Sequence, residues 1–236
     1  MNDSSEHKSR KLQGFLLIAM LLLFGIVFNR KLIESYIYPQ PKITSNTSAA
    51  RRASNSWNKL FVDSSFRLVQ DGDLILRTGT DAVSDMFRKA NTHDKTYSHA
   101  GLVFIENGIP VVYNFMGSAQ NPRALMRRDS LNSYITPYSN SGFAVYRFML
   151  SKNEKEQLHD ISVKYFKESR KFDPNFNLET DSLLYCTEYI YKALVETTHK
   201  EDYFPLTQMA DFRFIAVDNL YSRKDMKLIC KIGYKQ

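Results

Sequence analysis

The order of apolar runs and turn residues predicts a β-hairpin near the middle of the chain. Two apolar runs, Ser98–Ile105 and Ile109–Phe115, flank the pair Asn107-Gly108. An Asn-Gly pair between apolar runs is the strongest short-range hairpin signal, because both residues tolerate the positive φ angles of a two-residue turn. If these two residues form the centre of the turn, opposite residues have numbers that sum to 215, as 107 and 108 do.

Apolar periodicity and capping residues predict further elements on both sides of this hairpin. In chain order they are a strand at 73–77 after the Asp71-Gly72 turn, a helix capped by Thr80 or Asp81 that runs to about 90, a strand at 142–148, a helix from a Ser151 and Glu154 capping box to about 169, a helix from about 185, and one or two closing strands before 236. Strands and helices do not alternate as βαβ units. The predicted fold class is therefore α+β.

An uncharged apolar segment near the N-terminus predicts a membrane anchor. Residues 14–28 are fifteen consecutive residues without a charge, bounded by basic residues at 8, 10, 11, 30 and 31. A spanning helix needs about 20 apolar residues, and neighbours on both sides extend this run. We therefore expect a short tail at 1–12 and a transmembrane anchor at 13–33. A cleaved signal peptide is the alternative, but no small-x-small cleavage site follows the run.

Small polar residues and two prolines follow the apolar segment. They predict a linker at 34–56 that holds a folded domain at 57–236 away from the membrane. Three basic residues precede the apolar run and two follow it directly. The positive-inside rule therefore favours a cytoplasmic N-terminus and an extracytoplasmic domain. The predicted location is a membrane, crossed once.

The composition is that of a globular protein, with 43% hydrophobic and 24% charged residues. The formal net charge is +7, but residues 51–236 contain 26 Lys and Arg against 22 Asp and Glu, a net charge of +4. The basic residues of this part are mostly scattered, so we expect no nucleic-acid partner. A weak attraction to anionic lipid headgroups is the functional alternative to a solvated surface.

The cysteines and histidines do not predict a metal site. Cys186 and Cys230 are the only cysteines, which excludes a disulfide-dense scaffold and a four-cysteine zinc site. The acidic and amide residues at 173–181 alternate as in a calcium loop, but Leu178 and Leu184 stand where that loop needs Gly and Glu. The five histidines lack the spacing of zinc ligands. We expect neither a metal nor a cofactor.

His99 begins an apolar strand, and the other strand of the hairpin offers it a polar neighbour. In the register given above, His99 lies opposite Met116, and Asn114 is its diagonal neighbour on the same face. An Asn114 carbonyl that accepts a hydrogen bond from one imidazole nitrogen would leave the other nitrogen free to act as a base. A purely structural histidine is the alternative.

Cys186 stands where a loop gives way to a helix. The first turn of a helix offers unpaired N–H groups and the positive end of the helix dipole. Both stabilise a thiolate, so we expect a thiol pKa below the reference value of about 8.5. A buried and inert cysteine is the alternative. Cys230 lies in a stretch typical of a closing strand, and we expect it to be structural.

Five segments, taken together and in this order, resemble the successive motifs of the YiiX-like permuted papain enzymes. That family contains circularly permuted relatives of the NlpC-type cell-wall cysteine peptidases. The segments are DGDLIL from Asp71, YSHAGLV from Tyr97, VVYNF from Val111, FDPNF from Phe172 and LYCTEYI from Leu184. The resemblance covers roughly residues 60–195, and the histidine precedes the cysteine, as it does in the permuted family.

The resemblance implies a papain-like domain with a central antiparallel sheet packed on helices. It also implies a role for six residues: Cys186 as nucleophile, His99 as base, Asn114 as the third polar residue, and Glu188, Tyr185 and Asp173 in substrate binding. Relatives often carry Glu where this chain has Asn114, which weakens the expected support for an imidazolium. An interaction of Glu188 with the helix dipole is the alternative to a place in the site wall.

The function implied is that of a membrane-anchored cysteine hydrolase. It would cleave an amide, in a cell-wall peptide or an amino-acid derivative, through a thioester intermediate. A lipid-directed thiol hydrolase or acyltransferase of the same fold is one alternative. A catalytically inactive envelope protein that only binds its ligand is another. The expected partners are the substrate and the membrane, and the sequence does not indicate an oligomeric state.

Overall fold

The computed structural model describes residues 47–117, 121–209 and 212–236. The predicted tail at 1–12, the predicted anchor at 13–33 and residues 34–46 of the predicted linker lie outside these residues. Within the described part of the chain, no helix is both long enough and apolar enough to cross a membrane.

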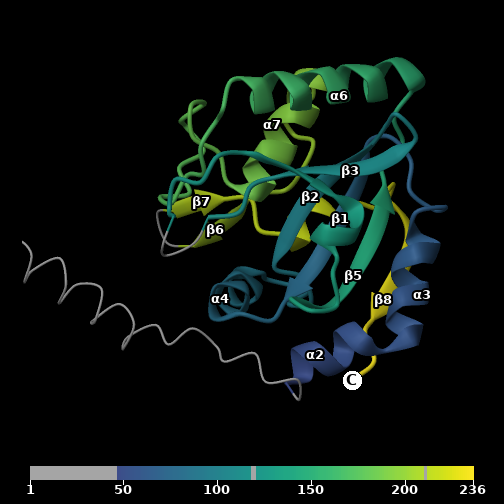
Figure 1. The fold of residues 1–236 in the computed structure, drawn as a ribbon. Helices are drawn as coiled ribbons and strands as arrows, with labels where there is room; N and C mark the ends of the chain where they lie inside the picture. Colours follow the sequence, from purple (N-terminus) through teal and green to yellow (C-terminus); the bar gives the residue numbers. More distant parts are fainter. Residues whose placement is uncertain (1–46, 118–120, 210–211) are drawn as a thin grey trace, which may run out of the picture. The chain divides into compact units, whose positions relative to one another are not determined.

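A six-stranded sheet forms the centre of the folded unit (Figure 1). Its strand order is β4-β3-β2-β1-β5-β8, and every neighbouring pair is antiparallel. The strands are β1 (Asp73–Gly79), β2 (His99–Glu106), β3 (Ile109–Asn114), β4 (Arg127–Ser130), β5 (Asn140–Arg147) and β8 (Lys227–Gly233). A separate two-stranded sheet joins β6 (Thr207–Met209) to β7 (Phe212–Phe214). The predictions of an α+β class and of a central antiparallel sheet are confirmed.

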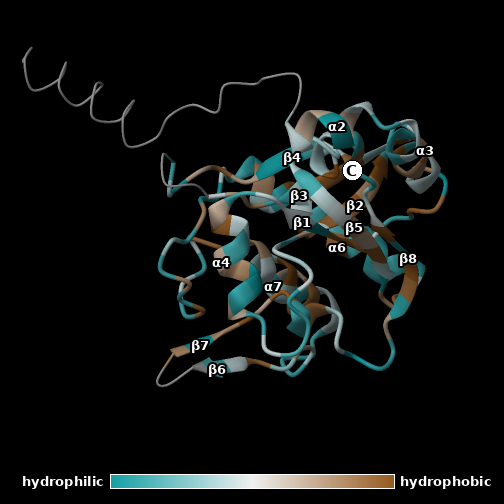
Figure 2. Ribbon diagram, turned by 90° about the horizontal axis from the view of Figure 1, so that it is seen from below, coloured by the Kyte–Doolittle hydropathy of each residue, from teal (hydrophilic) through white to brown (hydrophobic). Residues whose placement is uncertain are grey.

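Helices pack on both faces of the central sheet (Figures 1 and 2). The described helices are α2 (Ser48–Ser54), α3 (Ser56–Ser65), α4 (Ala82–Ala90), α5 (Leu131–Tyr134), α6 (Lys152–Lys167), α7 (Cys186–Thr198) and the short 3-10 helix η1 (Asp218–Leu220). Leu158 of α6 and Ile190 of α7 share one buried cluster with Leu74 of the sheet. Val62 of α3 and Leu131 of α5 share the second buried cluster with residues of the opposite sheet face.

Strand β1 shows how the two faces are divided. All seven of its residues are buried. Leu74 and Leu76 belong to the cluster under α6 and α7, whereas Ile75 belongs to the cluster under α3 and α5. Successive side chains of a strand point to opposite faces. The apolar run in β1 is uninterrupted because helices cover both faces of the sheet. The same alternation places Arg77 on the same face as Ile75.

The hairpin of β2 and β3 has the predicted register. Gly101 pairs with Asn114 and Glu106 with Ile109, so each pair sums to 215. Asn107 and Gly108 have φ angles of 51° and 78°, as the two-residue turn requires. The ladder ends at Asn114, so the pairing of His99 with Met116 is not formed. On its other side, His99 pairs with Arg77 of β1.

The predicted helices are also present. Asp81 caps α4, and Ser151 and Glu154 form both hydrogen bonds of the capping box that opens α6. This helix ends at Lys167, close to the predicted end. The last described segment contains β8 as a closing strand.

The folded unit begins earlier than Trp57, where the sequence placed it. Residues 48–54 of the predicted linker form α2, and the Arg52 guanidinium is buried in the domain. Its Nε donates to the carbonyls of Pro137 and Asn140, both at 3.2 Å. Asn58 Nδ2 in turn donates to the carbonyls of Arg52 and Lys235. The polar composition of this stretch reflects helix caps and buried hydrogen bonds rather than a linker.

Candidate functional site

The ring of His99 is held by a chain of two hydrogen bonds that begins in α4. His99 Nε2 lies 3.0 Å from Ser84 Oγ, and Ser84 Oγ donates to Asp81 Oδ2 at 2.7 Å. Burial alone would raise the pKa of Asp81, but the hydrogen bonds from the Ser84 backbone and hydroxyl outweigh it and lower that pKa. Asp81 is therefore an ionised acceptor at neutral pH.

The direction of these two bonds fixes the tautomer of His99. A serine hydroxyl has one proton to donate, and Ser84 gives it to the Asp81 carboxylate. His99 Nε2 must then carry the hydrogen and donate it to Ser84 Oγ. Nδ1 is left unprotonated, with a lone pair that can accept a proton from another group.

Close backbone packing places Ser84 against the ring of His99. Asp81 accepts from the Ser84 N–H at 2.9 Å and so caps the N-terminus of α4. Gly79, at the end of β1, lies beneath Ser84: a Cβ on Gly79 would be 2.0 Å from Ser84 Oγ. Only glycine at this position lets the serine hydroxyl lie between the acid and the imidazole.

His99 itself is a neutral base in this environment. Its side chain is buried, and burial holds the pKa of the imidazole well below its usual value. The positive charge of Arg77 lowers that pKa further, while Asp81 opposes the shift. The imidazole is therefore unprotonated at neutral pH, as a general base must be before it acts.

Cys186 is the first residue of α7 and is buried. Burial raises the pKa of its thiol, although the backbone N–H groups of Ala100 and Thr187 and the charge of Arg77 all act in the opposite direction. The expectation of a lowered thiol pKa is therefore wrong for this site, because desolvation outweighs the helix N-terminus. Cys186 and Cys230 are both free thiols in the structure.

Cys186 and His99 are neighbours around the start of β2. The backbone N–H of Ala100, the residue after His99, is one of the groups that act on the Cys186 thiol. Phe87 of α4 contacts the His99 ring edge-on, with ring centroids 5.9 Å apart, and lines a pocket together with Cys186. No hydrogen bond joins the imidazole to the thiol among the described residues. The resting pair is thus a neutral thiol beside a neutral imidazole.

The pocket beside Cys186 has a volume of about 220 Å³ and an almost wholly apolar wall. Phe87, Phe176, Phe212, Phe214 and Ile215 contribute to this wall. Two of the residues that line it, Met86 and Phe212, are large apolar side chains exposed to solvent. In Figure 2, α4 and the β6-β7 pair lie near the start of α7, where this pocket is found.

Asn114 does not contact His99. Its Nδ2 donates to the carboxylate of Asp129 at 3.0 Å and to the carbonyl of Val112 at 3.3 Å. Its Oδ1 is buried and has no hydrogen-bond partner. The expected hydrogen bond from the imidazole to this oxygen is therefore not formed. Ser84, which no sequence motif indicated, forms the hydrogen bond to the imidazole that was expected of Asn114.

The three residues expected to bind substrate have internal hydrogen bonds or ion pairs. Glu188 accepts from the Tyr185 N–H at 3.2 Å, as in a capping box, and lies 3.0 Å from Lys192 Nζ. Burial raises the pKa of Glu188 to about 7, against the effect of Lys192. Asp173 accepts from two backbone N–H groups of its own loop.

Of these three residues, only Tyr185 lines the pocket beside Cys186. Its hydroxyl accepts from the Ile215 N–H at 2.9 Å. Glu188 and Asp173 support the helix start and the preceding loop.

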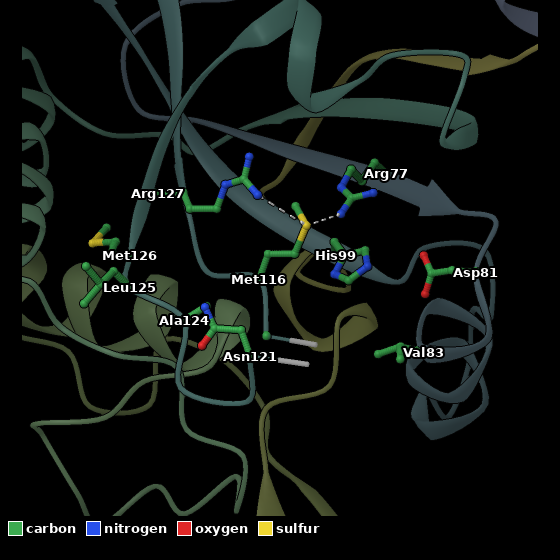
Figure 3. Close-up of a pocket in the computed structure, with 11 residues that line it drawn as sticks. Arg77, Asp81, Val83, His99, Met116, Asn121, Ala124, Leu125, Met126 and Arg127 are labelled. Atoms are coloured by element: carbon green, nitrogen blue, oxygen red, sulfur yellow. Dashed lines mark hydrogen bonds between the residues drawn. The ribbon is translucent and has the colours of Figure 1, made fainter. Parts of the chain in front are cut away.

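Arg77 is a second residue of the site that the sequence analysis did not single out. It lies opposite His99 on the neighbouring strand, and both line a pocket of about 550 Å³. Figure 3 shows Arg77 and Arg127 approaching the sulfur of Met116 from two sides, with the His99 ring next to them. The signal that could have revealed Arg77 is a charged residue directly after the apolar run of β1, a strand that is buried along its whole length.

Comparison with known proteins supports the fold. No protein-family model and no curated protein sequence matches the chain. Among solved structures, the chain is similar to the crystal structure of the metalloprotein YiiX from Escherichia coli O157:H7, with a TM-score of 0.59 and 16% sequence identity. The match covers 70% of this chain and 99% of that one. At this level of identity the match shows the fold alone: the chain has a YiiX-like fold.

Proposed function

We propose that this protein is a cysteine hydrolase in which Cys186 is the nucleophile and His99 the general base. The observation that carries the proposal is the hydrogen-bonded chain from Asp81 through Ser84 to His99 Nε2. It leaves the lone pair of Nδ1 free on a residue whose chain neighbour, Ala100, has its backbone N–H at the Cys186 thiol, the first residue of α7. An oriented base next to a thiol at a helix N-terminus is the arrangement that activates a sulfur nucleophile.

The mechanism begins from a neutral pair. His99 Nδ1 accepts the thiol proton as the sulfur of Cys186 attacks an acyl carbonyl, and the imidazolium that forms is stabilised through Ser84 by the Asp81 carboxylate. Backbone N–H groups at the start of α7 hold the oxyanion. His99 then returns the proton to the leaving group, which leaves a thioester on Cys186. Water attacks the thioester with His99 again as base, and the acid is released.

A metal ion has no place in this scheme. The related crystal structure is described as that of a metalloprotein. In the described part of this chain, no group of three or more His, Cys, Asp and Glu side chains is placed to hold a metal ion. The donor set therefore does not fit a metal centre, and every proposed step uses the side chains and backbone of the chain itself.

The proposed substrate is an amide of a cell-wall peptide or of an amino-acid derivative. This choice follows from the likeness of the five sequence motifs to the permuted papain enzymes. The apolar segment at 13–33 fits the same proposal, because an anchor there would hold the enzyme at an envelope membrane with its domain outside the cytoplasm.

A lipid-directed hydrolase is the second candidate, and the pocket beside Cys186 favours it. The walls formed by Phe87, Phe176 and Phe214 could bury an acyl chain directly beside the nucleophile. Exposed apolar side chains next to it, Met86 and Phe212, would suit contact with an aggregated lipid.

Parallel assays of the full-length protein separate these candidates. Muropeptides and phospholipid vesicles are incubated with the protein and with Cys186→Ala, and released acids and amines are quantified. Hydrolysis of muropeptides that is lost in Cys186→Ala supports the peptide substrate. Hydrolysis of phospholipids lost in the same variant supports the lipid substrate. Binding of either without turnover would contradict the enzyme and point to an envelope binding protein.

A further inference from the structure

Arg77 is a buried cation without a carboxylate partner among the described residues. Only 4% of its surface is exposed, yet it forms no ion pair. Its Nη1 donates to Asn140 Oδ1 at 2.7 Å, and the guanidinium lies over the Tyr134 ring, 5.1 Å from its centroid. A buried charge is costly unless it is paired with an opposite charge. The guanidinium therefore lacks the partner that such a position calls for.

The unused donors of Arg77 are on one edge of the guanidinium. Nε is buried and has no hydrogen-bond partner. Nη2 is 3.4 Å from the sulfur of Met116, which is a weak acceptor. Nε–H and the adjacent Nη2–H point in parallel, and together they match the two oxygens of a carboxylate or phosphate. One edge of Arg77 is thus preorganised for an anion.

The surrounding pocket contains no carboxylate that is free to pair with Arg77. Asp81 is engaged by the Ser84 backbone and hydroxyl. Asp129, which lines the pocket next to it, accepts from Arg127 at 2.8 Å and from Asn114 at 3.0 Å. Arg127 lies on the far side of Met116 (Figure 3), but its charge is paired with Asp129, so Arg77 is the cation of this pocket that lacks a carboxylate partner among the described residues.

We propose that Arg77 binds an anionic group of the substrate, a carboxylate or a phosphate, through its Nε and Nη2 edge. This proposal rests on the proposed function, since it places the anion in the pocket that Arg77 shares with His99, the proposed base. The side chain of Met116 shifts or is lifted to admit the anion. The substrate class is then an acyl compound with a negative charge on the part that occupies this pocket.

A pair of thiol reagents that differ only in charge provides the test. Full-length protein with Cys230→Ala is treated with iodoacetate and, separately, with iodoacetamide at the same pH. The ratio of the two alkylation rates at Cys186 is measured by mass spectrometry. Both reagents react with the thiolate, so a change in thiol pKa cancels in the ratio. The ratio reports attraction of the carboxylate to the site.

We expect the ratio of iodoacetate to iodoacetamide to fall about tenfold in Arg77→Gln, as loss of a charged hydrogen-bond pair predicts. Arg88→Gln is the matched control, because Arg88 is paired with Asp85 on the outer side of α4, and its ratio should stay that of the parent protein. An unchanged ratio in Arg77→Gln overturns the anion site and leaves the proposed function intact. Alkylation of Cys186 at neutral pH that is unaffected by His99→Ala overturns the proposed function, and the anion site with it.

A second measurement needs no substitution at the buried arginine. Inorganic phosphate and acetate are added separately to the parent protein at equal ionic strength, and the rate of alkylation by iodoacetamide is followed. We expect at least one of them to slow the reaction relative to sodium chloride. Stronger protection by phosphate points to a phosphate on the substrate, and stronger protection by acetate points to a carboxylate. Equal rates in all three salts would overturn the proposal.

Discussion

Arg77 and His99 lie directly opposite each other on β1 and β2, so a permanent positive charge stands beside the candidate base. Burial is the main reason that the pKa of His99 is low, and Arg77 adds to the effect. The imidazole of His99 is therefore not protonated in the resting protein. In the proposed mechanism this keeps the base ready to accept a proton, and a bound anion would relieve the repulsion once the imidazolium forms.

The reactivity of Cys186 should follow an unusual pH profile. The measurement uses a Cys230→Ala background and iodoacetamide. We expect the alkylation rate of Cys186 to keep increasing at pH values where an ordinary thiol is already fully ionised, because burial raises the pKa of this thiol. At neutral pH, His99→Ala should slow the reaction about tenfold or more, since base assistance is lost. Alkylation at neutral pH that is unaffected by His99→Ala would rule out the proposed dyad.

Substitution of Ser84 should lower the activity, whereas substitution of Asn114 should leave it unchanged. Ser84→Ala removes the hydroxyl that fixes the tautomer of His99, so we expect kcat to fall about tenfold to a hundredfold with little change in KM. The backbone N–H at this position still meets Asp81, so α4 keeps its cap.

Asn114→Ala is the matched comparison in the same assay. It loses a hydrogen bond to Asp129 at the β3-β4 edge and should leave kcat close to that of the parent. A large loss of kcat in Asn114→Ala, together with a normal Ser84→Ala, would restore Asn114 as the orienting residue.

A methyl group at Gly79 should displace Ser84 and so disturb the hydrogen bonds to His99. Its Cβ would lie 2.0 Å from Ser84 Oγ, so we expect Gly79→Ala to lower the free energy of unfolding by about 1–3 kcal/mol. Gly233→Ala is the control, because a Cβ there meets nothing within 4 Å. Thermal or urea unfolding of both variants checks the prediction. Equal stability of the two variants would show that α4 moves away at little cost.

Glu188 should make the free energy of unfolding depend on pH, and a substitution of this residue should remove that dependence. The pKa of this carboxyl is raised to about 7 in the folded state, so the native protein binds its proton more tightly than the unfolded chain does. Stability from this group is therefore greatest below an unfolded pKa of about 4.3 and is lost as the pH rises to about 7.

Glu188→Gln should reduce the difference in unfolding free energy between pH 5 and pH 8 by about 3 kcal/mol, the equivalent of a shift of two to three pKa units. Urea titrations of the parent and the variant at the two pH values provide the measurement. The same pH dependence in both proteins would mean that Glu188 is ionised over the whole range.

Local signals in the sequence were sufficient for most elements of the central layer and for the register of one hairpin, but not for α2, α3, α5 or β4. The Asn107-Gly108 turn fixes the pairing of β2 with β3 because two residues with positive φ leave a single way to align the strands. Ser151 and Glu154 set the start of α6 in the same way. The extent of the folded unit was not predictable on this basis, because Arg52 is buried by carbonyls about 85 residues away in the chain.

The site shows the same division between local and distant information. Cys186 and His99 could be singled out as candidates because each sits at the start of an element and within one of the five motifs that resemble a known family. Asn114 was placed on the correct side of the correct strand, yet its side chain turns to Asp129, which belongs to a strand that was not predicted. Ser84 of α4 and Arg77 of β1 come next to His99 only when their elements pack against β2, and no local sequence signal indicates this contact. The net pKa of Cys186 depended on burial, which the helix position alone does not reveal.

The raised pKa of Cys186 also bears on how the protein withstands oxidation. Peroxides react with the thiolate, and the sulfenic acid that forms can proceed to irreversible products. A thiol that is buried and protonated at rest is a poor target for these reagents. In the proposed enzyme the sulfur becomes reactive only when a substrate is in place and His99 takes the proton. Burial that slows the reactions of the free thiol would then preserve it, and this would suit the proposed place of action outside the reducing cytoplasm.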